Sequence, residues 1–145
     1  MHKTLIALTL LVAGSAWAQT TPVGLWKTID DKTKSERALV RISESGGLLS
    51  GRIEKLLAPD AKPNAVCDKC EDDRKDKAIV GMEIVRGVKK AEVENTWDGG
   101  TILDSTDGKI YKVRMQTADG GKKLEVRGFV GMPMLGRTQT WMRVE

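Results

Sequence analysis

The stretch IYKVRMQTADGGKKLEVRGF, residues 110–129, predicts a β-hairpin. From Tyr111 to Met115 every second residue is apolar or aromatic, which is the period of a strand with one face in water. The sequence DGG at 119–121 then supplies residues that tolerate a positive φ, as a tight turn requires. The alternation resumes after the turn. Two antiparallel strands joined by this turn are therefore expected.

The same period of two recurs along most of the chain, for example in ALVRI at 38–42. Turn signals separate the alternating stretches at 45–47, 98–100 and 107–108, and at 98–100 we expect a tight turn rather than a cation site. The predicted strands are 23–29, 37–43, 48–56, 79–86, 92–97, 100–104, 109–117, 122–130 and 137–144. Eight or nine short antiparallel strands predict an all-β meander, either a barrel or a sandwich. A barrel is attractive because closure removes unpaired strand edges.

The N-terminus, residues 1–18, has the form of a secretory signal peptide. Lys3 stands near its head, an apolar stretch runs from Leu5 to Val12, and small residues end it at Ala18. The apolar stretch is far shorter than the ~20 residues that span a bilayer, so a membrane-anchoring helix is the less favoured interpretation. Cleavage after Ala18 is predicted to leave one β-barrel domain, residues 19–145, in the periplasm or secreted, without a membrane span.

Residues 19–145 contain no histidine, the commonest general base and metal ligand, because His2 lies in the predicted signal peptide. No nucleophile motif stands out, so we expect no catalytic residue, no metal and no cofactor. An enzyme would require a concave cluster of titratable residues, for example around Asp98 or Asp104. The positive charges of residues 109–145 alternate with apolar residues, which favours a solvated barrel face over a nucleic-acid site.

Residues 58–77 show no alternation and are predicted to form one long loop. Cys67 and Cys70 lie in this loop at C-x-x-C spacing. A structural zinc site needs two more Cys or His ligands, so a site completed by acidic residues or shared between two chains is the less favoured alternative. A thioredoxin-like pair needs the start of a helix in an α/β fold. Export therefore favours a Cys67–Cys70 disulfide, with a modest effect on global stability because the closed loop is short.

The two ends of the chain resemble the lipocalin signature. Gly24-x-Trp26 opens the first predicted strand, and Arg137 and Arg143 lie on the last. In lipocalins the tryptophan packs at the closed end of the barrel beneath an arginine from the end of the chain. The resemblance implies that Trp26, Arg137 and Arg143 close the barrel, with a cation over the indole contributing about 0.5–2 kcal/mol. A plain core role for Trp26 is compatible with this.

A broader resemblance covers almost all of residues 19–145. The segments that carry it, in order, are Gly24-x-Trp26, Gly51-x-Ile53, RKDKAIVGMEIV at 74–85, WDGGTILD at 97–104, GKIY at 108–111, VRGFVG at 126–131 and LGRTQTWMR at 135–143. Together they resemble the bacterial domain-of-unknown-function family 2147, whose members are small exported proteins. The resemblance implies an antiparallel, meandering, calycin- or lipocalin-like β-barrel with one long loop. It implies no activity.

Strand parity suggests a ligand site inside the barrel. The predicted lining residues, drawn from the first strand and the last two, are Trp26, Arg127, Phe129, Gln139 and Trp141. Such a wall suits an amphipathic or anionic small molecule, because an arginine fork can bind a carboxylate or phosphate with two hydrogen bonds. This hypothesis requires a cavity of roughly a few hundred Å³.

A second hypothesis assigns the protein to a different class. Here the barrel is filled by its own side chains, as small barrels often are. The outer face or the 58–77 loop would then bind another envelope protein, as an inhibitor or assembly factor. This hypothesis requires an exposed apolar patch or a grooved loop. The size of the internal cavity separates the two hypotheses.

Overall fold

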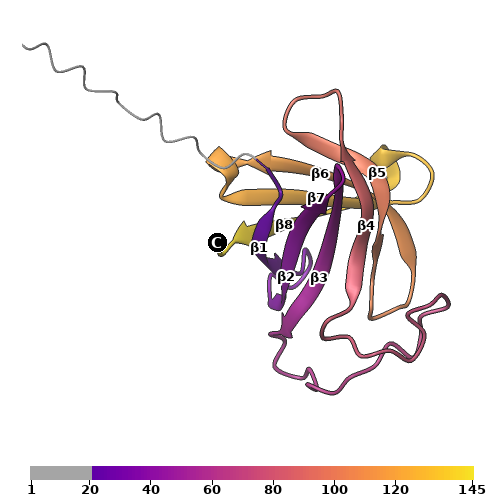
Figure 1. Cartoon of the computed structure of the whole chain (residues 1–145). Coiled ribbons are helices and arrows are strands. Elements are labelled where there is room, and N and C mark those ends of the chain that lie inside the picture. Colours follow the sequence, from indigo (N-terminus) through magenta and orange to yellow (C-terminus); the bar gives the residue numbers. More distant parts are fainter. Residues whose placement is uncertain (1–20) are drawn as a thin grey trace, which may run out of the picture.

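The computed structural model describes residues 21–145, in which eight antiparallel strands form a closed barrel (Figure 1). The predicted signal peptide lies outside the described residues. Each strand is hydrogen-bonded to the next in sequence, and the last strand returns to the first. The strands are β1 (Gly24–Ile29), β2 (Glu36–Ser45), β3 (Leu48–Leu56), β4 (Glu83–Lys90), β5 (Thr96–Leu103), β6 (Ile110–Ala118), β7 (Lys123–Phe129) and β8 (Arg137–Arg143). The predicted all-β meandering barrel is confirmed.

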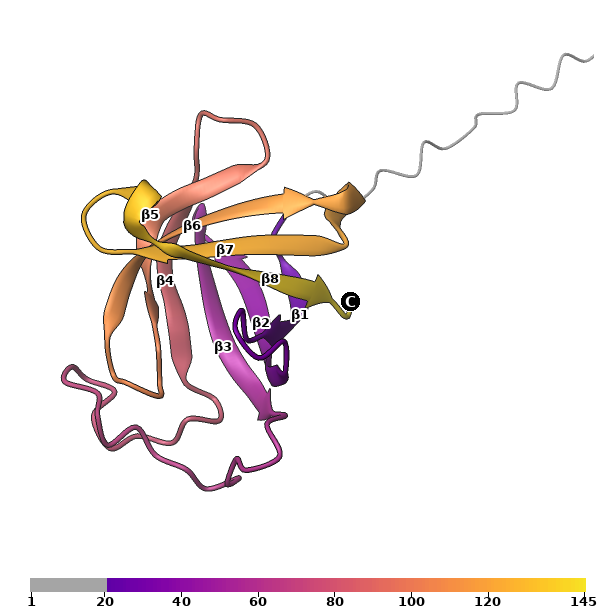
Figure 2. The ribbon, with the colours of Figure 1, turned by 180° about the vertical axis from the view of Figure 1, so that it is seen from behind.

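The barrel closes between β1 and β8, where Trp26 pairs with Arg143 and Lys27 with Met142. Figure 2 shows the end of β8 beside β1, seen from behind. Inward side chains from all strands form one core, because alternate residues of each strand point to the same side. Its largest fully buried side chains are Trp26, Trp141, Ile42, Met115 and Leu124. Among residues 21–145 no helix is long and apolar enough to cross a membrane.

The turn predicted at residues 98–100 is wrong. β5 runs without interruption through this segment, and its register with β6 shifts between Trp97 and Gly100. Gly99, with φ of 81°, lies in a β-bulge, which uses the same left-handed conformation as a tight turn. An added Cβ on Gly100 would lie 2.2 Å from the carbonyl oxygen of Arg86, so β4 leaves no room for a side chain there. The turn between β4 and β5 is instead at residues 91–95.

The long loop between β3 and β4, residues 57–82, packs against the barrel rather than extending into solvent. Its Cys67, Cys70, Ile79 and Met82 belong to the buried core cluster. Gly108 of the β5–β6 turn has a φ of 73°, and an added Cβ there would lie 2.0 Å from a backbone oxygen of the loop. The loop therefore lies directly against this turn.

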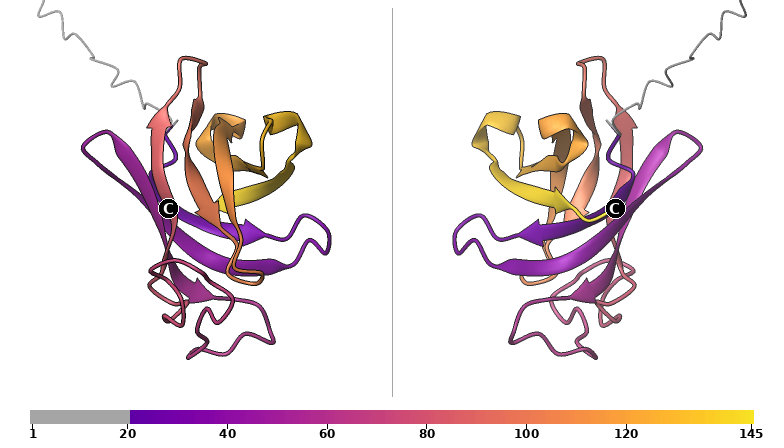
Figure 3. Two further views of the ribbon diagram at one scale, coloured as in Figure 1. Left: turned by 90° about the vertical axis from the view of Figure 1, so that its right-hand side faces the viewer. Right: turned by 90° about the vertical axis from the view of Figure 1, so that its left-hand side faces the viewer.

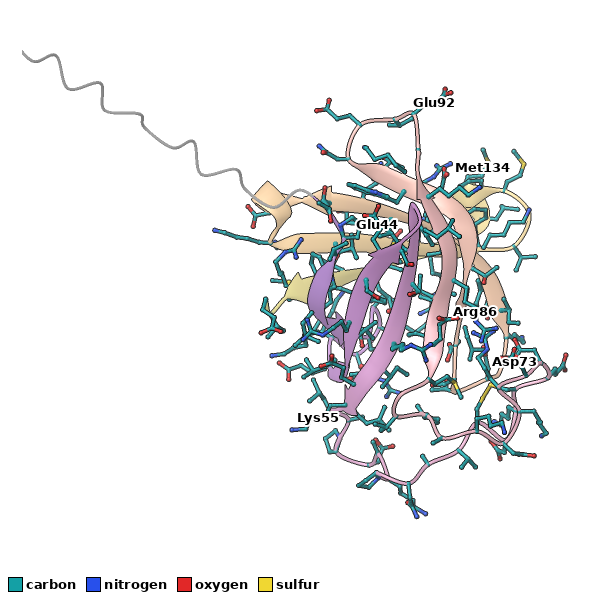
Figure 4. All side chains as sticks on the ribbon, in the orientation of Figure 1. Glu44, Lys55, Asp73, Arg86, Glu92 and Met134 are labelled. Carbon is teal, nitrogen blue, oxygen red and sulfur yellow. A yellow bond between two sulfur atoms is a disulfide. The ribbon has the colours of Figure 1, made fainter. Side chains whose placement is uncertain are left out.

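Two arginines tie the same loop to β4. Arg74, which is buried, donates to both carboxylate oxygens of Asp72 and to the carbonyl oxygen of Glu83, the latter at 2.9 Å. Arg86 donates from two nitrogens to Asp73, each at 3.0 Å, and Figure 4 shows the two side chains facing each other. These contacts hold the charged part of the loop on the outer side of β4.

The predicted disulfide between Cys67 and Cys70 is present, with both residues buried. Replacing both by alanine is expected to lower the free energy of unfolding by about 2 kcal/mol, because the closed ring is short. The larger effect is local: tryptic cleavage of folded protein at Lys69 to Lys77 should accelerate by about tenfold or more. Limited proteolysis followed by mass spectrometry measures this. Unchanged cleavage, in the variant and in reduced wild type alike, would contradict a bracing role for the disulfide.

Asp72 makes the stability of the barrel sensitive to acid. The hydrogen bond from Arg74 lowers the pKa of Asp72 from 3.8 to about 2. Because the folded-state pKa is lowered, the stabilisation is present above about pH 4 and is lost as the pH falls toward 2. Asp72→Asn should cost up to about 2 kcal/mol at neutral pH, and its difference from wild type should vanish near pH 2. Denaturant unfolding across this range tests it, with exposed Asp60→Asn as control. A difference independent of pH would refute the assignment.

Candidate ligand cavity

A cavity of about 420 Å³ lies inside one end of the barrel. It opens among the β1–β2, β5–β6 and β7–β8 connections, while the β2–β3, β4–β5 and β6–β7 turns lie at the opposite end. Figure 3 shows these two ends, with the long loop at one and the β4–β5 turn at the other. The main apolar side chains of the cavity wall are Val40, Ile53, Leu56, Ile84, Ile102, Leu103, Val126 and Trp141. This end of the barrel is therefore not filled by side chains.

Two residues on neighbouring strands, Thr28 and Trp141, bring polar groups to the cavity wall. The Trp141 indole nitrogen donates to the Gln139 side-chain oxygen at 3.1 Å. The Thr28 hydroxyl oxygen accepts from the Ala38 backbone N–H at 3.1 Å, which leaves its own proton able to donate. The cavity thus offers polar groups within an apolar wall, the composition typical of small-molecule sites.

The closed end of the barrel is built around Trp26, which has no exposed surface and does not border the cavity. Its indole nitrogen donates to the Pro22 carbonyl oxygen at 2.7 Å. The Arg143 guanidinium carbon lies 4.3 Å from the centroid of its ring. Arg143 also donates to the carbonyl oxygens of Gly121, Val23 and Thr21 at 2.6, 2.8 and 2.6 Å. One arginine therefore joins three chain segments over the tryptophan.

Arg137 lies at the other end of β8, at the mouth of the cavity. It donates to both carboxylate oxygens of Asp31, at 3.0 and 2.5 Å. The hydrogen bond from Arg137 lowers the pKa of Asp31, and the same contact raises the pKa of Arg137. This pair closes the barrel between the start of β8 and the β1–β2 connection, far from Trp26.

The rim of the mouth carries more carboxylates than arginines. Its charged residues are Asp30, Asp31, Asp104, Asp107, Arg37 and Arg137. The Tyr111 hydroxyl points to the same rim and donates to Asp107 at 3.2 Å. Burial and the Asp107 charge raise the pKa of Tyr111, so its hydroxyl stays protonated at neutral pH. With four aspartates against two arginines, the rim is net negative.

The structure brings together only part of the predicted ligand set. Gln139 and Trp141 line the cavity, and Trp26 lies beneath it. The shared face predicted for Arg127 and Gln139 is wrong, because the register pairs Val126 with Gln139 and Arg127 with Thr138. Arg127 therefore points outward.

Phe129 belongs to the rim rather than to the cavity wall proper. It borders the cavity where β7 ends, and its strand partner is the exposed Lys112. It lies against the returning β7–β8 connection, since an added Cβ on Gly136 would lie 2.7 Å from the Phe129 Cβ.

Several cavity residues were not in the predicted set, including Tyr111, Ile102 and Gly128. Strand alternation already placed Tyr111 on the face of buried Val113, so a signal for that residue existed. None of residues 57–82 borders the cavity, so the long loop lies beside the mouth and does not cover it. Within residues 21–145 no cluster of three His, Cys, Asp or Glu side chains is arranged to hold a metal ion.

Comparison with known proteins identifies both the fold and the family. A solved structure of protein HP1028 from the human pathogen Helicobacter pylori, described as belonging to the lipocalin family, superposes with a TM-score of 0.72. The match covers 85% of this chain and 82% of that chain at 19% sequence identity, which shows a shared lipocalin-like barrel. No curated protein matches the sequence significantly. The family model DUF2147, described as an uncharacterized protein conserved in bacteria, matches residues 24–143, and the chain therefore belongs to this family.

Proposed function

We propose that the barrel binds one small amphipathic molecule and performs no chemistry on it. The observation that carries this proposal is the cavity of about 420 Å³, open at one end, within a lipocalin-like barrel. This volume falls in the range of small-molecule sites, about 300–1,000 Å³. Lipocalin-like barrels are typically binding folds, which supports a carrier or sensor role over catalysis.

The lining suggests how such a molecule would lie. Its apolar part would contact Val40, Ile53 and Val126 in the wall, with burial contributing about 25 cal/mol per Å² of apolar surface. Its polar end would meet Gln139 at depth or Tyr111 near the mouth. The net negative rim favours a neutral or positively charged polar end. The anionic alternative loses support because Arg127 points outward and Arg137 is already paired with Asp31, so that Arg37 is the remaining arginine at the rim.

Two further predictions from the sequence, export of the chain and the interaction-protein hypothesis, bear on this proposal. We propose that the chain is exported to the periplasm or beyond, which is supported by the N-terminal sequence and by the Cys67–Cys70 disulfide, a bond typical of oxidising compartments. The interaction-protein hypothesis required a filled barrel, and the cavity favours the binding hypothesis over it.

A fluorescence titration tests the proposed function. N-phenyl-1-naphthylamine, a neutral apolar probe, is expected to bind at one molecule per chain with a Kd on the order of 1–10 µM. Dodecylamine should displace it at lower concentration than dodecanoate, because the rim is net negative. Absence of saturable binding would contradict the function. Preferred displacement by dodecanoate would contradict only the polarity assigned to the ligand.

A further inference from the structure

The β7–β8 connection forms an apolar tip at the mouth of the barrel. Its sequence, VGMPMLG at 130–136, contains no polar side chain. Four side chains of this tip are more than half exposed: Val130 at 70%, Met132 at 56%, Met134 at 72% and Leu135 at 75%. Figure 4 shows Met134 at the edge of the molecule. Exposed apolar residues gathered in this way mark an interaction surface.

The tip is held in a fixed shape by Arg127. This arginine donates to the carbonyl oxygens of Pro133 and Met134 and, at 2.7 Å, to the Thr138 hydroxyl. Within the tip, the Leu135 N–H donates to the Met132 carbonyl oxygen at 3.0 Å. Because the tip is already ordered, docking it on a partner would cost little conformational entropy.

Positive charge flanks the tip on the outer face of the barrel. Arg127 is bound to neutral oxygens, so its charge is not cancelled within this cluster. Lys112 is exposed and pairs with Phe129, the residue directly before the tip. Lys109 is also exposed and directly precedes β6, at the same end of the barrel as the tip. An apolar tip beside basic residues is the composition of a surface that enters an anionic membrane interface.

The small size of the tip favours a lipid surface over a protein as its partner. A stable protein interface buries about 800 Å² on each side and takes about 20–30 residues from each partner, whereas the tip has seven. Lipid acyl chains require no shape match. Val130 and Leu135 also border the cavity, so the tip lies at one side of the mouth. We propose that the 130–136 tip inserts into the interface of an anionic lipid bilayer. The docking does not depend on the proposed ligand.

Vesicle flotation tests this proposal on the chain from Gln19, which retains every strand. Vesicles of phosphatidylglycerol and phosphatidylethanolamine at low salt are expected to bind the protein about tenfold more tightly than phosphatidylcholine vesicles. The double variant M134S/L135S should lower the partition coefficient by about tenfold or more. Val93→Ser is the matched control, because Val93 is 65% exposed on the β4–β5 turn at the opposite end, and it should change binding less than about twofold.

A second measurement keeps the test valid if M134S/L135S folds poorly. The chain has two cysteines, both in the disulfide, so Leu135→Cys adds a single thiol for an environment-sensitive dye. Anionic vesicles should shift emission of the dye to the blue at position 135 and not at Val93→Cys. Three results would overturn the proposal: no binding of wild type to anionic vesicles, equal binding of folded M134S/L135S, or a wild-type dimer in sedimentation velocity that M134S/L135S makes monomeric.

Discussion

Trp26→Ala is expected to lower the free energy of unfolding by about 3–5 kcal/mol, the largest effect of any single change considered for this barrel. The indole is fully buried, and its removal leaves a cavity at the closed end. The change also removes the hydrogen bond to Pro22 and the ring beneath the Arg143 guanidinium. Because Trp26 lies where β1 meets β8, the loss weakens the contact that closes the barrel.

Denaturant unfolding followed by circular dichroism measures this loss. Val93→Ala, in the exposed β4–β5 turn, is the control and should change stability by less than about 0.5 kcal/mol. Arg143→Ala and the double variant complete a mutant cycle, in which the coupling between Trp26 and Arg143 should be about 0.5–2 kcal/mol. A loss below about 1 kcal/mol for Trp26→Ala would show that the closed end does not depend on this residue.

Gly128→Phe is expected to weaken binding of N-phenyl-1-naphthylamine by about 100-fold or more, because the new ring would occupy the cavity. Gly128 faces inward, between Val113 and Arg137 in the sheet. An added Cβ meets its nearest atom, the Tyr111 Cβ, at 3.5 Å, which is ordinary contact. The backbone therefore accepts a side chain at this position, and the ring must extend into the cavity space.

The matched control for this variant is Glu125→Phe, which places the same ring on the outer face of the same strand. It should leave probe affinity within about twofold of wild type. Overpacking can cost about 1–3 kcal/mol, so thermal unfolding of both variants is compared to exclude loss of fold. A folded Gly128→Phe protein that still binds one probe with wild-type affinity would place the binding site outside the barrel.

The elements predicted well from sequence are those that local chemistry determines. The 110–129 hairpin needs only alternation and a turn that accepts positive φ, and the structure has β6, a short turn and β7 there. The Cys67–Cys70 bond joins residues three apart in sequence, so it needs no knowledge of the tertiary fold. The strand pattern left a barrel or a sandwich open, and the lipocalin-like barrel was implied by the resemblance of the two chain ends and of the ordered family segments.

The elements predicted poorly depend on register between distant strands. The glycines at 99 and 100 fit both a turn and a bulge, and only the close approach of β4 distinguishes the two. Because neighbouring residues of a strand point to opposite faces, Arg127 and Val126 of β7 must lie on different faces. Which of them faces inward depends on the pairing with β8. The Arg137–Asp31 pair joins residues 106 apart in sequence, and no local pattern in either segment signals it. The charged residues that meet at the rim of the mouth could therefore not be predicted from the sequence.

The barrel has two ends with different roles. At the closed end, Trp26 and Arg143 stabilise the fold, whereas the open end combines an apolar cavity, a net negative rim and an apolar tip. The long loop contributes to neither role directly, because it packs beside the mouth against the β5–β6 turn. We therefore expect changes at the closed end to affect stability and changes at the open end to affect the proposed binding.

Native mass spectrometry of the protein purified from its own cell envelope tests ligand binding in the cavity most directly. Wild-type protein is expected to carry one small molecule per chain, released on mild activation. Gly128→Phe protein, purified in the same way, should appear as bare chain, and Glu125→Phe should resemble wild type. Bare wild-type chain, or an equal mass excess on Gly128→Phe, would contradict the assignment of the cavity as a binding site.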